Sequence, residues 1–186
     1  VSAISSVADQ IIVTAPAGSE KEIQKLVGDG VTVVTGGATR SESVRIGLSK
    51  VSAGAEYVLI HDAARALASP DLAKRVVASL KNGDVAVIPG LAQTDTVKIV
   101  GASGIVSSTP DRAAMRRVQT PQGFTYELII QAHAQSGEAT DDAALVESLG
   151  KPVRVIEGEE RAIKITTPAD MATALQFLGK SANFKS

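Results

Sequence analysis

The most constraining feature of this chain is a regular alternation of strand-like and helix-like segments through its first half. Short runs of β-branched and other apolar residues predict strands, and the amphipathic segments between them predict helices. The helix expected over residues 41–51, for instance, places Val44, Leu48 and Val51 on one face. Alternating strands and helices fold into a sheet covered on both faces, so the sequence predicts an α/β fold with a doubly wound, mostly parallel sheet. The predicted strands are 10–14, 31–35, 57–60 and 84–89, and the predicted helices are 19–27, 41–51 and 71–80.

The alternation ends near residue 94. Residues 95–100 and 106–109 resemble strands and flank Gly101-Ala102-Ser103-Gly104, which together predict a β-hairpin. A lone hairpin cannot bury its own faces, so residues 94–120 are expected to project as a β-arm that pairs with a second copy of the chain. No linker or repeat interrupts the sequence, so residues 1–186 are predicted to form a single domain. Its remaining elements are predicted helices 125–135, 141–149 and 167–177 and short strands 153–156 and 162–166.

Composition narrows the classes of function. The chain has 186 residues, of which 44% are hydrophobic, and its formal net charge is −1, so no global positive field attracts nucleic acid or an anionic membrane. No apolar run is long enough to cross a bilayer. Cysteine is absent, which excludes disulfides, thiolate catalysis and cysteine zinc sites. We therefore expect a cytoplasmic protein that binds neither nucleic acid nor membrane.

Polar residues follow the strand at 57–60 directly, in the order His61-Asp62-Ala63-Ala64-Arg65. Ligands of α/β proteins bind at the carboxyl ends of parallel strands. Asp62 could hold a metal ion or a sugar hydroxyl there, and Arg65 could meet a phosphate. A simple salt-bridged pair at a strand end is the alternative.

A second candidate is the loop Gly36-Gly37-Ala38, which joins a strand to the helix that carries Ser43. Glycines permit close approach of a ligand, and a helix start offers free backbone N–H groups. An ordinary glycine turn before a capped helix explains the same residues.

Three further groups are ambiguous when each is taken alone. Thr96 and Lys98 would share one face of a strand, which equally suits the polar side of an exposed strand. Thr140-Asp141-Asp142 is most simply a helix N-cap with acids in its first turn. Lys164, by contrast, lies in the apolar strand predicted at 162–166, where a lysine usually requires an anion.

Taken together, these motifs resemble the 2-C-methyl-D-erythritol 4-phosphate cytidylyltransferase family of the non-mevalonate isoprenoid pathway, over essentially the whole chain. Any single motif is modest support, but their common order makes coincidence an inadequate explanation. The motifs are Gly36-Gly37, Arg40-x-x-Ser43-Val44, His61-Asp62-Ala63-Ala64-Arg65, Asp95-Thr96-Val97-Lys98, Arg112, Gln119-Thr120-Pro121-Gln122, Thr140-Asp141-Asp142-Ala143 and Ile163-Lys164-Ile165-Thr166.

The resemblance implies a Rossmann-like nucleotidyltransferase fold, CTP and a polyol phosphate as substrates, Mg²⁺ as cofactor and a homodimer interlocked by the arm. The implied catalytic residues are Lys164, Arg112 and Asp62, with Asp62 near Mg²⁺. The implied nucleotide-binding residues are Gly36, Gly37, Ala38, Ser43, Asp62 and Ala63. The implied substrate-binding residues are Thr96, Arg112, Thr120, Thr140 and Lys164, of which Thr96 or Arg112 would serve the neighbouring subunit.

The resemblance also carries one departure and two alternatives. Members of the family begin with a strand and a glycine-rich loop whose Arg and Lys grip the triphosphate, and nothing here matches that loop. We therefore expect an incomplete amino terminus, and little or no activity if the loop is truly lost. The alternative functions are ribitol-5-phosphate cytidylyltransferase and a non-catalytic CTP-binding module.

Overall fold

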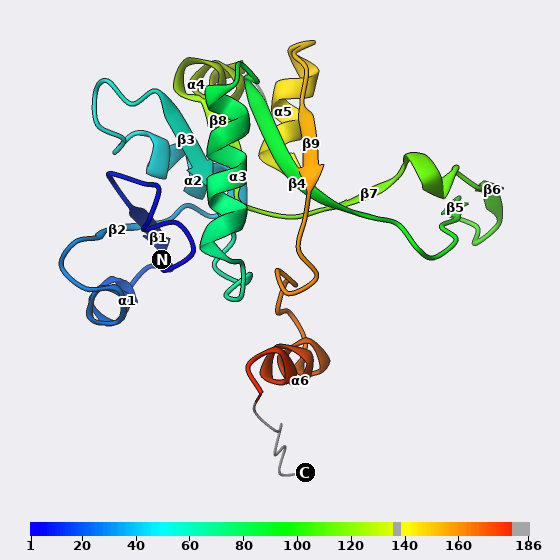
Figure 1. Cartoon of the computed structure of the whole chain (residues 1–186), viewed down its shortest axis with the longest axis horizontal. Coiled ribbons are helices and arrows are strands. Elements are labelled where there is room, and N and C mark those ends of the chain that lie inside the picture. The colour runs from blue at the N-terminus through cyan, green and yellow to red at the C-terminus, as the bar shows by residue number, and fades with distance from the viewer. Residues whose placement is uncertain (136–138, 180–186) are drawn as a thin grey trace.

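The computed structural model describes residues 1–135 and 139–179. Strands and helices alternate along the chain, and one long segment, residues 93–115, projects from the sheet between two of its strands (Figure 1). The elements are β1 (Ile12–Ala15), α1 (Glu20–Val27), β2 (Thr32–Thr35), α2 (Arg40–Leu48), β3 (Tyr57–Ile60), α3 (Pro70–Lys81), β4 (Ala86–Ala92), β5 (Ile99–Val100), β6 (Val106–Ser108), a 3-10 turn (Arg112–Ala114), β7 (Arg116–Val118), β8 (Gln122–Thr125), α4 (Tyr126–Gln135), α5 (Asp142–Ser148), β9 (Arg154–Glu157) and α6 (Pro168–Phe177).

The main sheet has five strands in the order β3-β8-β4-β7, and β9 also pairs with β4. β3 and β4 both run antiparallel to β8, so they are parallel to each other, and β9 is parallel to β4. β7 is antiparallel to β4, while β1 and β2 form a separate parallel pair. The predicted α/β class is confirmed, but the main sheet is mixed rather than mostly parallel: β3, β4 and β9 run in one direction, and β7 and β8 run in the other.

Side chains alternate between two apolar layers across the sheet. Val58 and Ile60 of β3 face α2, α4 and α5, in the cluster that surrounds the fully buried Phe124. Tyr57 and Leu59 point the other way and pack against Val76 and other residues of α3. Because successive strand residues point to opposite faces, a continuous apolar run is what a strand covered on both sides requires. The doubly wound arrangement follows from this pattern.

Two predictions about strands were wrong. β8 was not predicted, because its Gln122 and Gly123 resemble loop residues, yet both are buried between β3 and β4. Residues 162–166 form no strand. Their backbone is held by other groups instead: the Ala162 carbonyl accepts from Arg65, and the Ile165 N–H donates to the Ala64 carbonyl.

The arm is confirmed as a hairpin with shorter strands than expected. β5 and β6 pair antiparallel with a register shift, and the arm extends away from the sheet (Figure 1). Thr96 and Lys98 precede β5, so the predicted strand face does not exist there. Apolar side chains of the arm face solvent, with exposed fractions of 52% for Ile99 and 71% for Ile105.

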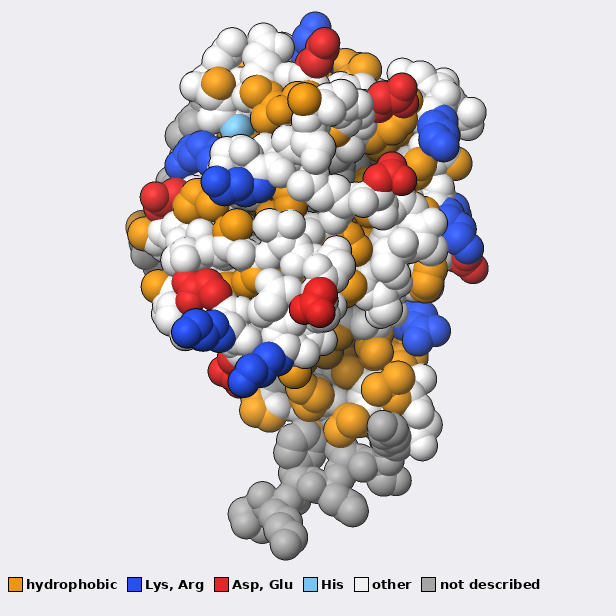
Figure 2. Space-filling view, turned by 90° about the vertical axis from the view of Figure 1, so that its left-hand side faces the viewer, with side chains coloured by type: hydrophobic (Ala, Val, Ile, Leu, Met, Phe, Trp, Pro, Cys, Tyr) orange, Lys and Arg blue, Asp and Glu red, His pale blue; other side chains and the backbone are white. Residues whose placement is uncertain are grey.

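Apolar side chains also gather at the end of the molecule that carries α6 (Figure 2), where Met171, Phe177 and Leu178 are exposed. Thr167 begins α6 with a reciprocal capping box to Asp170. The described helices include none that is both long enough and apolar enough to span a bilayer.

We predict that Phe124→Ala lowers the free energy of unfolding by about 3–5 kcal/mol, because it empties the centre of the larger apolar cluster. Phe177→Ala, at an exposed position of α6, is the matched control and is expected to change it by less than about 0.5 kcal/mol. Urea unfolding followed by circular dichroism measures both. Equal losses in the two variants would show that the core is not centred on Phe124.

Candidate functional site

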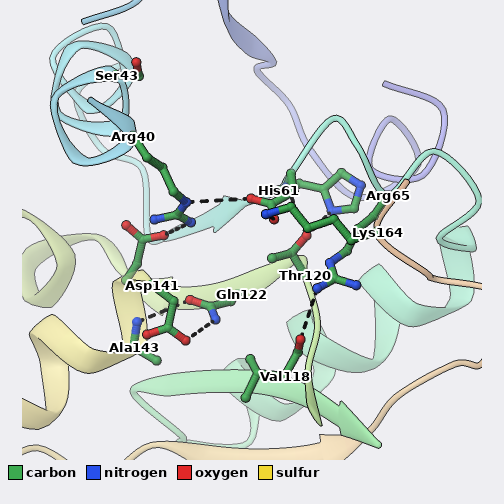
Figure 3. Close-up of polar contacts among 12 residues, drawn as sticks. Arg40, Ser43, His61, Arg65, Val118, Thr120, Gln122, Asp141, Ala143 and Lys164 are labelled. Carbon is green, nitrogen blue, oxygen red and sulfur yellow. Dashed lines mark hydrogen bonds and ion pairs between the residues drawn. The ribbon is translucent and has the colours of Figure 1, made fainter. Parts of the chain in front are cut away.

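Arg40 and Lys164, both labelled in Figure 3, come together near the carboxyl end of β3, where each pairs with Asp62. Asp62 follows His61, the first residue after β3, and its side chain is only 18% exposed. Its Oδ2 lies 3.1 Å from Nζ of Lys164, and its Oδ1 lies 3.7 Å from Nε of Arg40. Two cations from distant parts of the chain therefore flank the two oxygens of one carboxylate.

Arg40 is held from its other side by Asp142. The guanidinium Nη2 donates to Oδ2 of Asp142 at 2.6 Å, and Nε2 of His133 lies 3.0 Å from the other oxygen. Burial alone would raise the pKa of the Asp142 carboxyl, but its hydrogen bonds with His133 and Arg40 outweigh burial and lower that pKa. Asp142 is thus an ionised, fully buried carboxylate with both oxygens engaged.

The backbone at Asp62 is fixed by Thr120. The Asp62 N–H donates to Oγ1 of Thr120 at 3.0 Å, and the same hydroxyl lies 3.0 Å from Nδ1 of His61. Burial lowers the pKa of His61, which favours the neutral ring that can accept the Thr120 proton. Thr120 is 5% exposed, so in this structure it positions the Asp62 loop.

Lys164 lies in an irregular segment that side chains hold in place. Arg65 donates from Nη1 to the Ala162 carbonyl at 2.8 Å and from Nη2 to the Val118 carbonyl at 3.1 Å. The Gln119 amide also donates to the Ala162 carbonyl, at 3.3 Å. Arg65, which the sequence suggested as a phosphate ligand, instead joins the Lys164 segment to β7. The anion expected near Lys164 is the Asp62 carboxylate.

The glycine loop packs tightly against the start of α2. A Cβ at Gly36 would lie 2.9 Å from Oγ of Ser43, so only glycine fits without movement. The Gly37 N–H donates to that hydroxyl at 3.0 Å, and the Ala38 N–H donates to Oε2 of Glu42 at 2.7 Å. These two amides are therefore satisfied within the loop, and a ligand using them would displace the Ser43 and Glu42 side chains.

The start of α5 is built around Gln122. Its amide donates to Oδ2 of Asp141 at 3.0 Å and accepts from the Ala143 N–H at 3.2 Å. Asp141 caps the helix, because its Oδ1 accepts from the Ala144 N–H at 3.0 Å. The N-cap interpretation of this motif is confirmed, and Thr140 stands exposed immediately before it.

The predicted site residues fall into four places. Asp62, Ala63, Thr120 and Lys164 come together at the end of β3. The glycine loop and Ser43 lie at the start of α2, next to Arg40, and Thr140 precedes α5. Thr96 and Arg112 belong to the arm, where Arg112 donates to the Thr94 carbonyl at 2.9 Å, and the structure does not bring them to Asp62 within one chain (Figure 1).

Sequence reasoning assigned no role in the site to Arg40, Gln122, His133 or Asp142, although all but His133 stand in the quoted motifs. Arg40 and Asp142 are 102 positions apart, so no local spacing relates them. The available signal was an arginine directly after a glycine loop, which by itself defines nothing.

Within the described residues, no group of three or more Asp, Glu, His or Cys side chains could enclose a metal ion. A site for Mg²⁺ does not require one, since Mg²⁺ is commonly held by one or two carboxylates together with substrate phosphates. Asp62, partly exposed and next to the cation Lys164, fits that pattern.

We predict that Thr120→Val, which keeps the side-chain shape, lowers the free energy of unfolding by about 1–3 kcal/mol. The substitution leaves the Asp62 N–H and the His61 ring nitrogen, both half-buried, without their partner. Thr173→Val, at an exposed position of α6, is the control. Urea unfolding of both variants is the measurement, and equal stabilities would mean that the Thr120 hydroxyl holds nothing in place.

Comparison with known proteins identifies the family. Residues 1–180 match the family model for 2-C-methyl-D-erythritol 4-phosphate cytidylyltransferase. The chain is 50% identical over 180 residues to the enzyme of that name from Rhodococcus opacus (strain B4), covering 96% of this chain and 79% of the relative. The corresponding enzyme from Nocardia farcinica (strain IFM 10152) is 50% identical over 178 residues, covering 95% and 77%.

Solved structures agree as well. The crystal structure of 4-diphosphocytidyl-2C-methyl-D-erythritol synthase from Anaerococcus prevotii DSM 20548 is similar, with a TM-score of 0.82 and 33% identity, covering 92% of this chain and 82% of that one. The crystal structure of the cytidylyltransferase from Thermus thermophilus has a TM-score of 0.79 and 38% identity, covering 91% and 82%. The chain belongs to the 2-C-methyl-D-erythritol 4-phosphate cytidylyltransferase family.

Proposed function

We propose that this protein transfers the cytidylyl group of CTP to 2-C-methyl-D-erythritol 4-phosphate, releasing pyrophosphate and forming 4-diphosphocytidyl-2-C-methyl-D-erythritol for isoprenoid precursor synthesis. The observation that carries the proposal is the Asp62–Lys164 pair at the carboxyl end of β3, beside the glycine loop, in a chain of this family. A carboxylate and an ammonium group are suited to a triphosphate and its counter-ion.

The chemistry requires positioning rather than proton transfer. An oxygen of the methylerythritol phosphate attacks the α-phosphorus of CTP, and the bond from that phosphorus to the bridging oxygen breaks as pyrophosphate leaves. A phosphate dianion is already a nucleophile, so no general base is needed. Catalysis then depends on alignment and on stabilising charge in the transition state. The Lys164 side chain is 48% exposed, so its ammonium group, which pairs with Asp62 in this structure, can turn to the reacting phosphates.

Mg²⁺ is the cofactor that we propose, with Asp62 as its protein ligand beside the phosphates. When bound, it supplies positive charge to the phosphate oxygens. The protein's own contribution is to keep the Asp62 carboxylate at one place, through Thr120 on the backbone and the two cations on the side chain.

We propose that the cytosine lies against Gly36, Gly37 and Ala38, with Ser43 nearby. Ribose and phosphates then extend toward Asp62 and Ala63. Ala63 and Thr140 are exposed, which leaves both accessible to a ligand. Thr120 is buried and engaged, so a contact with the substrate would have to compete with its bonds to Asp62 and His61.

The arm supports a homodimer. Ile99, Val100, Ile105 and Val106 are each at least half exposed, an arrangement that a partner's surface would stabilise. In such a dimer Thr96 and Arg112 would act in the partner's site, in agreement with their distance from Asp62 in their own chain. We propose a cytoplasmic location, with no nucleic acid or membrane as partner.

The second candidate substrate is ribitol 5-phosphate, since an enzyme that uses it would share the fold, the nucleotide and the arm. A non-catalytic CTP-binding module is the candidate of another class. Pyrophosphate release by the protein with its native amino terminus, given CTP, Mg²⁺ and each polyol phosphate in turn, separates them. Turnover with the methylerythritol phosphate alone supports the proposal, and turnover with the ribitol phosphate alone overturns it. Calorimetric CTP binding without turnover would leave a binding module.

In that assay Lys164→Ala and Asp62→Ala are each predicted to lower turnover at least about tenfold, a loss of about 1.4 kcal/mol or more in transition-state stabilisation. Both groups face the proposed phosphates, and both variants are expected to remain folded. Lys151→Ala, an exposed lysine between α5 and β9, is the matched control. Wild-type turnover in either folded variant would remove that residue from the mechanism.

Deleting Gly101–Gly104 together with β5 and β6 is predicted to give monomers, because the deletion removes the exposed apolar residues proposed as the interface. Sedimentation velocity of the wild type and the deletion variant measures the assembly. A deletion variant that still sediments as a dimer would place the interface elsewhere.

A further inference from the structure

Arg40 joins three elements of the site without belonging to any proposed substrate contact. It is the first residue of α2, and its guanidinium reaches Asp142 at the start of α5 and Asp62 after β3 (Figure 3). Residues before it form the glycine loop. The side chain therefore sits where the proposed nucleotide-binding loop, the α5 cap and the Asp62 loop meet.

The Asp142 end of this connection is rigid. Asp142 is fully buried, and its oxygens are taken by Nη2 of Arg40 at 2.6 Å and Nε2 of His133 at 3.0 Å. A buried carboxylate deprived of its cation is strongly destabilised, so the pair does not open readily. Because the guanidinium is planar, fixing Nη2 also fixes the direction in which Nε points.

The contact between Arg40 and Asp62 is an ion pair without a hydrogen bond. Nε lies 3.7 Å from Oδ1 of Asp62, beyond hydrogen-bond distance for this geometry but well within the range of an ion pair. Lys164 holds the other oxygen at 3.1 Å. The Arg40 side chain is 33% exposed and is tied to a buried partner, whereas that of Lys164 is 48% exposed and has no second anion among its described contacts.

These two cations therefore behave differently when a triphosphate arrives. Lys164 is able to turn from Asp62 to a phosphate, but Arg40 is kept in place by Asp142. We propose that Arg40 is a positioning residue, which holds the Asp62 carboxylate in its working orientation after Lys164 has left it. This inference rests on the proposed function only for its kinetic consequence, since the geometry that it explains is independent of the substrate.

The kinetic test compares Arg40→Gln with the wild type in the pyrophosphate assay at varied Mg²⁺. We expect the half-saturating Mg²⁺ concentration to rise and kcat to fall, each about tenfold, as is usual when a group that orients a metal ligand is removed. A loss of folded protein alone would lower kcat without moving the Mg²⁺ dependence. Arg154→Gln, which breaks the exposed pair with Asp84, is the matched control. An unchanged Mg²⁺ dependence in Arg40→Gln overturns the proposal.

Two further variants separate positioning from charge. Arg40→Lys keeps a cation for Asp142 and is expected to fold. A single ammonium group cannot contact both carboxylates in this arrangement, so the half-saturating Mg²⁺ concentration of Arg40→Lys should stay close to that of Arg40→Gln. Full restoration would show that charge alone matters. In an Asp62→Asn background, Arg40→Gln should change the remaining rate by less than about twofold, because its target is already altered. Independent, multiplicative losses would contradict an action through Asp62.

A measurement without substrate keeps this inference distinct from the proposed function. Crystal structures of Lys164→Ala and of the double variant Lys164→Ala/Arg40→Lys are expected to differ in the Asp62 side chain, which should leave its orientation or occupy more than one once neither Lys164 nor the Arg40 guanidinium holds it. An Asp62 carboxylate in the same place in both would overturn the positioning role, whatever the enzyme's activity. A silent wild type in the assay together with a displaced Asp62 in the double variant would overturn only the proposed function.

Discussion

The interaction on which this arrangement depends is the burial of an ionised carboxylate, Asp142, on one face of the sheet. Its oxygens are satisfied by His133 from α4 and Arg40 from α2, so three helices meet at one charge. Replacing such a buried group by apolar side chains often costs little stability. The charge instead fixes geometry, because Arg40 and His133 must each lie at hydrogen-bond distance from one of its oxygens. The start of α2, and with it the glycine loop, is thereby fixed relative to the sheet.

A second part of the site is held in place by β8 and the residues just before it. Thr120, just before this strand, accepts a hydrogen bond from the backbone N–H of Asp62. Gln122, the first residue of the strand, bonds Asp141 and the Ala143 N–H. The peptide bond between Thr120 and Pro121 is cis. One short segment thus sets both the Asp62 loop and the start of α5. Side chains in this segment are buried although they are polar, and each is paired, as buried polar groups must be.

The sequence predicted the elements well where local pattern decides them. The strand at residues 57–60 has the predicted bounds, because an apolar run covered on both faces has no other stable setting. The helices of the described ranges agree within a few residues, since caps such as Ser69 and Thr167 mark their starts. β8 escaped prediction because tertiary burial, rather than propensity, makes a strand of Gln-Gly-Phe-Thr. The segment around Lys164 failed for the opposite reason: its β-branched residues suit a strand, but Arg65 and Gln119 occupy the Ala162 carbonyl.

Part of the site was also predictable from local sequence pattern. Asp62 was identified because it lies in the polar run just after a strand, and Lys164 because a lysine among apolar residues needs an anion. That the anion is Asp62 itself is a fact of the fold, as is the pairing of Arg40 with Asp142. A mutual pair of charges at this place has a physical use. Unpaired, each would repel or attract its neighbours without a fixed geometry; paired, the two keep the loop after β3 and the loop before α6 together. In the proposed reaction a triphosphate would carry far more negative charge than one carboxylate, so it would compete for Lys164 at close range. If Lys164 leaves, the Asp62 carboxylate loses its nearest cation. The structure already places a second cation, Arg40, next to the oxygen that Lys164 does not contact.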